Sequence, residues 1–317
     1  MSSTKRIVSI VFPASLALIL GFVLLIPGKA GCWSYTGSIF TPDSTRMQNP
    51  VYQVPIPKDI TFAGESVPIH LFDVRESLDR ELQVNTYWHS QTVLLLKRAN
   101  RYFTLIEPIL KEKGVPDDFK YLAVAESALT QAVSPSQAVG FWQILEGTGK
   151  ELKLEINDEV DERYHIEKST RAACDFLLRS YKQYGNWTMA AASYNFGRNG
   201  INRQIERQGN NDYYDMVLGD ETGRYLFRIL AFKTIFENPE QYGFYMQPGN
   251  LYPPLKFFEV EIDSAVTSFA QFAAQFDTSY KMLKLYNPWL RRSFLTNKTN
   301  KKYTIKIPEP GFRESAY

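Results

Sequence analysis

The stretch from residue 119 to residue 127 reads FKYLAVAES and decides how the middle of this chain folds. In a helix, one face carries the i, i+3, i+4, i+7 set of Phe119, Leu122, Ala123 and Glu126. A carboxylate then lies on an apolar stripe, where burial disfavours its charged form and raises its pKa. A general acid needs such a carboxyl group near neutral pH. The alternative is a helix-end glutamate that reaches water, because structural carboxylates are common.

The sequence around this stretch has helical periodicity from about residue 74 to residue 244. The pattern predicts helical structure from about 74 to 113, ending at Gly114 and Pro116. Further helices are predicted over 169–184, from 187 through 194, and over 222–236, where Pro239 follows. This part of the chain is therefore predicted to be mainly α.

The pattern of apolar and polar residues changes after Pro253 and Pro254. Residues 257–262 and 303–307 alternate like strands, and two short helical segments lie between them, around 267–276 and 279–285. The order predicts a small α+β unit of the βααβ type.

The N-terminus has the pattern of an export signal. Lys5 and Arg6 precede a mostly apolar stretch from residue 7 to residue 26, about the roughly 20 residues that cross a bilayer as a helix. We predict that residues 1–31 are a signal peptide or a membrane anchor. Prolines punctuate the next segment, so residues 32–73 are predicted to be a Pro-rich tether.

Composition and motifs exclude several classes of function. The net charge is +2 and no sustained basic face is visible, so no nucleic-acid partner is predicted. The three histidines are isolated, and no cysteine pair has the spacing of metal ligands. No glycine-rich loop of the phosphate-binding type follows a predicted strand. No metal and no cofactor is therefore expected. Cys174 lies in an apolar helical stripe and is read as a core residue, although a disulfide with Cys32 stays open.

Five short motifs follow one another between residues 126 and 225. They are Glu126-Ser127, Ser134-Pro135, Gly140-Phe141-Trp142-Gln143, Ser193-Tyr194-Asn195-Phe196-Gly197 and Glu221-Thr222-x-x-Tyr225. In order and spacing they resemble the soluble lytic transglycosylase family, above all its membrane-bound murein transglycosylase D branch. Phe141, Ser193 and Phe196 depart from the family pattern, which has Leu, Ala and Ala there, and these changes remove no catalytic group.

The resemblance implies a lysozyme-like catalytic domain over 74–250, including an N-terminal helical extension. It implies a carbon-oxygen lyase that cleaves the β-1,4 bond between N-acetylmuramic acid and N-acetylglucosamine in peptidoglycan. Glu126 would act first as acid and then as base, and the product would carry a 1,6-anhydro-muramic end. The same resemblance places Tyr194 near the carboxylate as a polar partner. The resemblance implies substrate-binding roles for Ser127, Gln143, Tyr194, Asn195 and Glu221.

The C-terminal unit, residues 251–317, resembles LysM modules, which bind N-acetylglucosamine-containing glycans. Asp263-Ser264 replaces the usual Gly-Asp after the first strand, so glycan binding and a docking role both stay open. Cys32 follows Ala30-Gly31 like the lipidated cysteine of a bacterial lipobox, although Lys29 is atypical there. The predicted location is the periplasmic side of the cell envelope, held to the membrane by the N-terminal segment or by lipidated Cys32.

Two other functions remain open at this point. A muramidase of the goose lysozyme type would hydrolyse the same bond and leave a reducing end. A non-catalytic scaffold would bind peptidoglycan in the glycan groove that the resemblance implies for a lysozyme-like domain, without cutting it. Trp142 is read as a packing residue, and Asp161-Glu162-Arg163 as a polar loop held by an ion pair.

Overall fold

The computed structural model describes residues 51–317, and Tyr52–Tyr317 form one compact unit. The predictions for residues 1–31, for Cys32 and for the first part of the tether lie outside the described residues. Between residues 51 and 317, none of the helices has the length and apolar character needed to span a bilayer.

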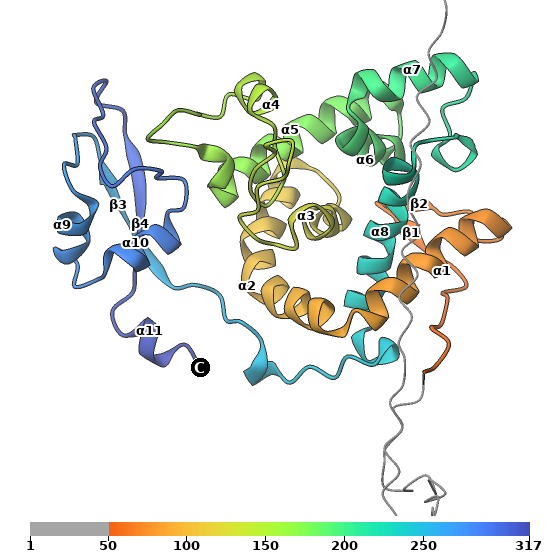
Figure 1. The fold of residues 1–317 in the computed structure, drawn as a ribbon, viewed down its shortest axis with the longest axis horizontal. Coiled ribbons are helices and arrows are strands. Elements are labelled where there is room, and N and C mark those ends of the chain that lie inside the picture. The colour runs from red at the N-terminus through yellow and green to blue at the C-terminus, as the bar shows by residue number, and fades with distance from the viewer. Residues whose placement is uncertain (1–50) are drawn as a thin grey trace, which may run out of the picture. The chain divides into compact units, whose positions relative to one another are not determined.

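The larger part of the unit is helical, which confirms the predicted fold class. It contains the hairpin of β1 (Thr61–Phe62) and β2 (Glu65–Ser66), and the helices α1 (Phe72–Tyr87), α2 (His89–Lys113), α3 (Lys120–Ser127), α4 (Glu146–Glu151), α5 (Ile166–Tyr184), α6 (Trp187–Phe196), α7 (Arg198–Gln208) and α8 (Asp220–Glu237). Figure 1 shows α3 surrounded by longer helices, and α3 packs against α2 and α8.

The helical periodicity located most of these elements. The helix predicted to end at Gly185 does so, since Gly185 adopts the left-handed conformation (φ 78°) that closes α5. The predicted helical stretch from 74 to 113 consists of two helices. Trp88 leaves the helical conformation (φ −84°, ψ 57°), and this break separates α1 from α2. Helix α7 was not predicted.

The short helix α3 is buried because its apolar stripe faces two neighbours. Phe119, Leu122 and Ala123 are fully buried, as the stripe predicts. Each large apolar side chain buried in this way contributes about 1.5–3 kcal/mol. Packing of the helix at these positions fixes the direction in which Glu126 leaves its last turn.

The structure differs from the predicted tether in the residues that precede α1. Four of these side chains are core residues rather than part of an extended linker: Val54, Phe62, Val67 and Ile69. The carboxylate of Glu65 accepts bonds from the backbone N–H groups of Trp187 (2.5 Å) and Thr188 (2.9 Å) at the start of α6. Hairpin β1–β2 therefore caps a helix that carries site residues.

The C-terminal part is the βααβ unit that the sequence predicted. β3 (Phe257–Ile262) pairs antiparallel with β4 (Tyr303–Pro308), and α9 (Phe269–Ala274) and α10 (Tyr280–Tyr286) lie between them in sequence, while α11 (Phe312–Ser315) ends the chain. Alternate residues of β4 face the core, namely Tyr303, Ile305 and Ile307.

Removal of the Glu65 side chain tests whether the hairpin stabilises α6. We expect Glu65→Ala to lower the free energy of unfolding by about 1–3 kcal/mol, because two N–H groups at a helix start lose a charged acceptor. Urea denaturation measures this change. Glu259→Ala, at an exposed β3 position, is the control, and equal effects of the two variants would contradict the capping role.

Candidate active site

Glu126 lies in the last turn of α3, next to a cavity of about 400 Å³. The cavity is lined by α1, α2, α3, α8, Trp88 between α1 and α2, and the residues after α3, including Glu81, Glu126, Ser127, Ala132, Arg224 and Arg228. Glu126 is partly exposed there, so its carboxyl group is held by the protein and still open to a ligand.

Tyr225 is the direct partner of this carboxyl group. Its hydroxyl donates a hydrogen bond to Oε1 of Glu126, and its ring is almost fully buried in α8. The sequence contained a signal for this residue, since Tyr225 ends the Glu221-Thr222-x-x-Tyr225 motif. The resemblance assigns a role to Glu221 of this motif and none to Tyr225, which lies one helical turn further on.

Burial raises the pKa of Glu126 to about 7. The hydrogen bond from Tyr225 and the positive charge of Arg228 lower the pKa, and the negative charge of Glu221 raises it. Desolvation is the largest of these effects. The carboxyl group can therefore hold a proton near neutral pH and also release it.

Two arginines of α8 hold the other acidic groups near the cavity. Arg224 Nε lies 2.8 Å from an oxygen of buried Glu81, and Arg228 contacts Glu221 at 3.2 Å. No Lys, Arg or His nitrogen of the described chain lies within 4.0 Å of the Glu126 carboxylate. Glu126 is thus the acidic group of this cavity that has no cation in direct contact, while Glu221 is exposed and paired.

Ser127 lines the same cavity beside Glu126. Its hydroxyl donates to the Ala123 carbonyl of its own helix at 3.2 Å, and little of the residue is exposed. The next two residues, Ala128 and Leu129, both have positive φ (55° and 53°). Non-glycine residues in this region are strained, and such strain gathers at functional sites.

Gln143, Tyr194 and Asn195 lie together at a second cavity of about 240 Å³. The Tyr194 hydroxyl donates to the Trp142 carbonyl (2.7 Å), and the Gln143 amide donates to the carbonyls of Ala132 (3.0 Å) and Gly140 (2.9 Å). Burial raises the pKa of Tyr194 well above its usual value, and the nearby charge of Glu126 adds to this effect. Tyr194 is therefore within electrostatic reach of the carboxylate that Tyr225 contacts.

The segment from Gln131 to Ile144, called the active-site loop below, contributes residues to both cavities. Ala132 lines the Glu126 cavity, and its carbonyl accepts the Gln143 bond. Gly140 permits the loop to close, since its φ is 80° and a Cβ atom there would lie 2.4 Å from the Arg163 carbonyl oxygen. Asn195 is fixed across the site by the Thr222 hydroxyl at 2.8 Å.

Two readings of individual residues are confirmed. Trp142 is fully buried and donates to the Thr170 hydroxyl at 2.8 Å, as a packing residue does. Asp161 and Arg163 form a buried ion pair at 2.7 Å.

Within residues 51–317, no cluster of three or more His, Cys, Asp or Glu side chains is arranged to hold a metal ion. Cys174 is buried in the core, whereas its partner in the open disulfide question, Cys32, is outside the described residues.

Two parts of the chain match models of known protein families. Residues 104–217 match the family model of the transglycosylase SLT domain. Residues 258–311 match the model of the soluble lytic transglycosylase C-terminal LysM-like domain. The two parts of the chain that contain these matches are called the SLT domain and the LysM-like domain below, after the models that they match. The motifs with Glu126, Gln143 and Tyr194 lie inside the first match, whereas Glu221 and Tyr225 lie beyond it.

The chain is also similar to membrane-bound lytic murein transglycosylase D of Escherichia coli. The identity is 30% over 176 residues for the protein from each of two strains. The match covers 54% of this chain and 38% of the relative, so the chain spans well under half the length of these relatives.

Replacement of Glu126 by glutamine tests the burial of the carboxyl group through stability. The folded protein retains the Glu126 proton up to about pH 7, whereas a glutamate in the unfolded chain loses it near pH 4.5. The wild-type protein therefore loses stability as pH rises from about 4.5 to 7 at this site. We expect Glu126→Gln to be more stable than wild type at pH 8, by at most about 3 kcal/mol, and unchanged at pH 4. Urea denaturation at pH 4 and pH 8 measures the free energy of unfolding of both proteins. The same stability difference between variant and wild type at the two pH values would contradict the prediction.

Two substitutions should move the pKa of Glu126 in opposite directions. Tyr225→Phe removes a hydrogen bond to the carboxylate, so we expect the pKa to rise above 7. Glu221→Gln removes a nearby negative charge, so we expect it to fall. Carboxyl ¹³C NMR titration of each variant gives the pKa. A shift of the Glu126 pKa in the same direction in both variants would show that Tyr225 and Glu221 do not set the proton affinity of Glu126.

Proposed function

We propose that the protein is a lytic transglycosylase that cuts the β-1,4 bond between N-acetylmuramic acid and N-acetylglucosamine in peptidoglycan. The observation that carries the proposal is one carboxyl group, Glu126, on a cavity wall with a pKa of about 7. The SLT domain match and the murein transglycosylase relatives support the choice of substrate.

In the first step, protonated Glu126 gives its proton to the glycosidic oxygen, and the bond from this oxygen to muramic C1 breaks. The N-acetylglucosamine side leaves as an alcohol, and positive charge develops at C1. In the second step, the Glu126 carboxylate takes the proton of the muramic C6 hydroxyl, and O6 bonds to C1. This closes the 1,6-anhydro ring, consumes no water and returns Glu126 to its protonated form.

The surroundings of Glu126 suit a group that works in both directions. Burial favours the acid needed for the first step, and the Tyr225 hydroxyl stabilises the carboxylate that acts as base in the second. Most glycosidases use a second carboxylate as nucleophile or water activator. Here Glu81 and Glu221 are both paired with arginines, which favours a mechanism with a tethered hydroxyl as nucleophile.

The remaining site residues are assigned to substrate binding. We assign Gln143, Tyr194 and Asn195 to the wall formed by the second cavity, and Ser127 to the Glu126 cavity. Glu221 lines neither cavity, and its assignment rests on its charge effect on Glu126. The predicted membrane attachment by residues 1–31 or by Cys32 places the enzyme at the periplasmic side of the cell envelope. The membrane-bound relatives agree with this location.

Digestion of isolated murein tests the function. We expect the wild-type protein to release fragments with 1,6-anhydro-muramic ends, and Glu126→Gln to release them at least about 100-fold more slowly, because the amide cannot transfer a proton. Mass spectrometry of the fragments identifies the ends. Glu259→Gln, on exposed β3, is the control for a loss of one acidic charge. Reducing muramic ends would instead show a hydrolase, and binding to murein without release of fragments would show a scaffold.

A further inference from the structure

The LysM-like domain is joined to the SLT domain by main-chain hydrogen bonds. The Asp161 N–H donates to the Trp289 carbonyl at 2.9 Å, and the Arg291 N–H donates to the Glu159 carbonyl at 2.7 Å. Val160 and Leu290 form an antiparallel bridge between these bonds. We call the pairing of residues 155–165 with residues 289–306 the joint.

Apolar side chains from both domains form one core at the joint. Val139, Val160 and Tyr164 of the SLT domain are buried in the same cluster as the LysM-like core residues Phe269, Leu283, Leu290, Leu295, Ile305 and Ile307. Apolar contact of this kind excludes water and holds the two surfaces in one arrangement. The LysM-like domain therefore shares a core with the SLT domain.

Charged side chains close the edge of the joint. Lys301 pairs with Glu155, and Lys306 pairs with Glu167 at the start of α5. The adjacent Lys302 instead lies 3.8 Å from Glu261 within the LysM-like domain, where both side chains are mostly exposed. Of these two neighbouring lysines, only Lys301 reaches across the joint.

The SLT side of the joint also holds the active-site loop. Arg163, fixed by its buried pair with Asp161, donates to the carbonyls of Gln137 and Ile144 at 3.3 Å each. The Gln131 amide donates to the Tyr164 carbonyl at 2.9 Å. Both ends of the loop that carries Gln143 are therefore bonded to a segment that the LysM-like domain covers.

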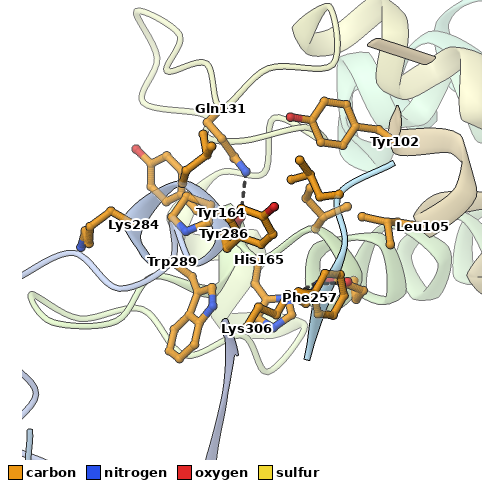
Figure 2. Close-up of a pocket in the computed structure, with 15 residues that line it drawn as sticks. Tyr102, Leu105, Gln131, Tyr164, His165, Phe257, Lys284, Tyr286, Trp289 and Lys306 are labelled. Atoms are coloured by element: carbon orange, nitrogen blue, oxygen red, sulfur yellow. Dashed lines mark hydrogen bonds and ion pairs between the residues drawn. The ribbon is translucent and has the colours of Figure 1, made fainter. Parts of the chain in front are cut away.

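A cavity of about 210 Å³ lies beside the joint (Figure 2), lined from both domains. Gln131 borders it from the active-site loop, and Tyr286 and Trp289 border it from the LysM-like domain. Neither Gln131 Oε1 nor the Tyr286 hydroxyl has a hydrogen-bond partner within the described chain. The loop is held beside this cavity by the Gln131 bond to the Tyr164 carbonyl and by Val139, which is buried in the shared core.

We propose that the LysM-like domain positions the active-site loop, and with it Gln143, through the joint. Residues 155–165 transmit this support, since they contact the LysM-like core on one side and the loop carbonyls on the other. The effect on cleavage rests on the proposed function, whereas the effect on loop order does not.

Two pairs of matched variants test the proposal. Val160→Ala trims a joint side chain and Lys301→Ala removes a cross-domain ion pair, while Val260→Ala and Lys302→Ala make the same changes inside the LysM-like domain. Hydrogen exchange of the loop amides is the first readout, because Gly140 and Ile144 donate within the loop to Ala132 and Val139. Steady-state cleavage of murein, measured well below the melting temperature, is the second.

We expect the two joint variants to speed exchange of these amides about tenfold and to lower kcat, with exchange in α8 unchanged. The two controls should leave the loop amides and kcat as in wild type. Unchanged loop exchange in folded Val160→Ala and Lys301→Ala would overturn the proposal, even if their melting temperatures fell. Lys301 is half-exposed, so its variant retains the fold and keeps the test decisive if Val160→Ala unfolds. A wild-type protein without cleavage activity would refute the enzyme function and leave the exchange result interpretable.

Discussion

The contact between helices α3 and α8 is the constraint on which the site depends. It places the Glu126 carboxyl group against the buried Tyr225 hydroxyl and removes much of its water. Water would otherwise stabilise the charged form, and the group would titrate as an ordinary glutamate. Both the proton affinity and the orientation of the carboxyl group therefore follow from the packing of two helices.

Three acidic side chains near one cavity have three different environments. Glu81 is buried and paired with Arg224, Glu221 is exposed and paired with Arg228, and Glu126 has a neutral hydroxyl as its partner. Charge at the first two is stabilised by a cation in contact, whereas charge at the third is opposed by burial. Burial without a cation in contact sets the Glu126 carboxyl group apart from the two paired carboxylates and suits a group that acts as an acid and a base. It costs the fold some stability, a cost that functional sites commonly impose on a protein.

The sequence predicted the features that depend on local pattern. The apolar stripe of residues 119–126 located Glu126 on a buried face, and alternation located β3 and β4. Features that depend on distant partners were missed or misplaced. Tyr225 reaches Glu126 from 99 residues away, so no local pattern shows that the two meet. Residues 54–69 lack periodicity, so the sequence predicts a tether there. Their few apolar side chains nevertheless pack against the helical core.

The packing of residues 54–69 also limits how the protein could be released from any attachment ahead of them. A protease that cut between Val54 and Ile69 would remove core side chains, and a cut after Glu65 would take away the carboxylate that caps α6. The shed body would then be less stable than the attached one. Release of an intact domain therefore requires a cleavage point on the N-terminal side of Val54. The segment that follows is packed into the core, and this packing limits the access of a protease.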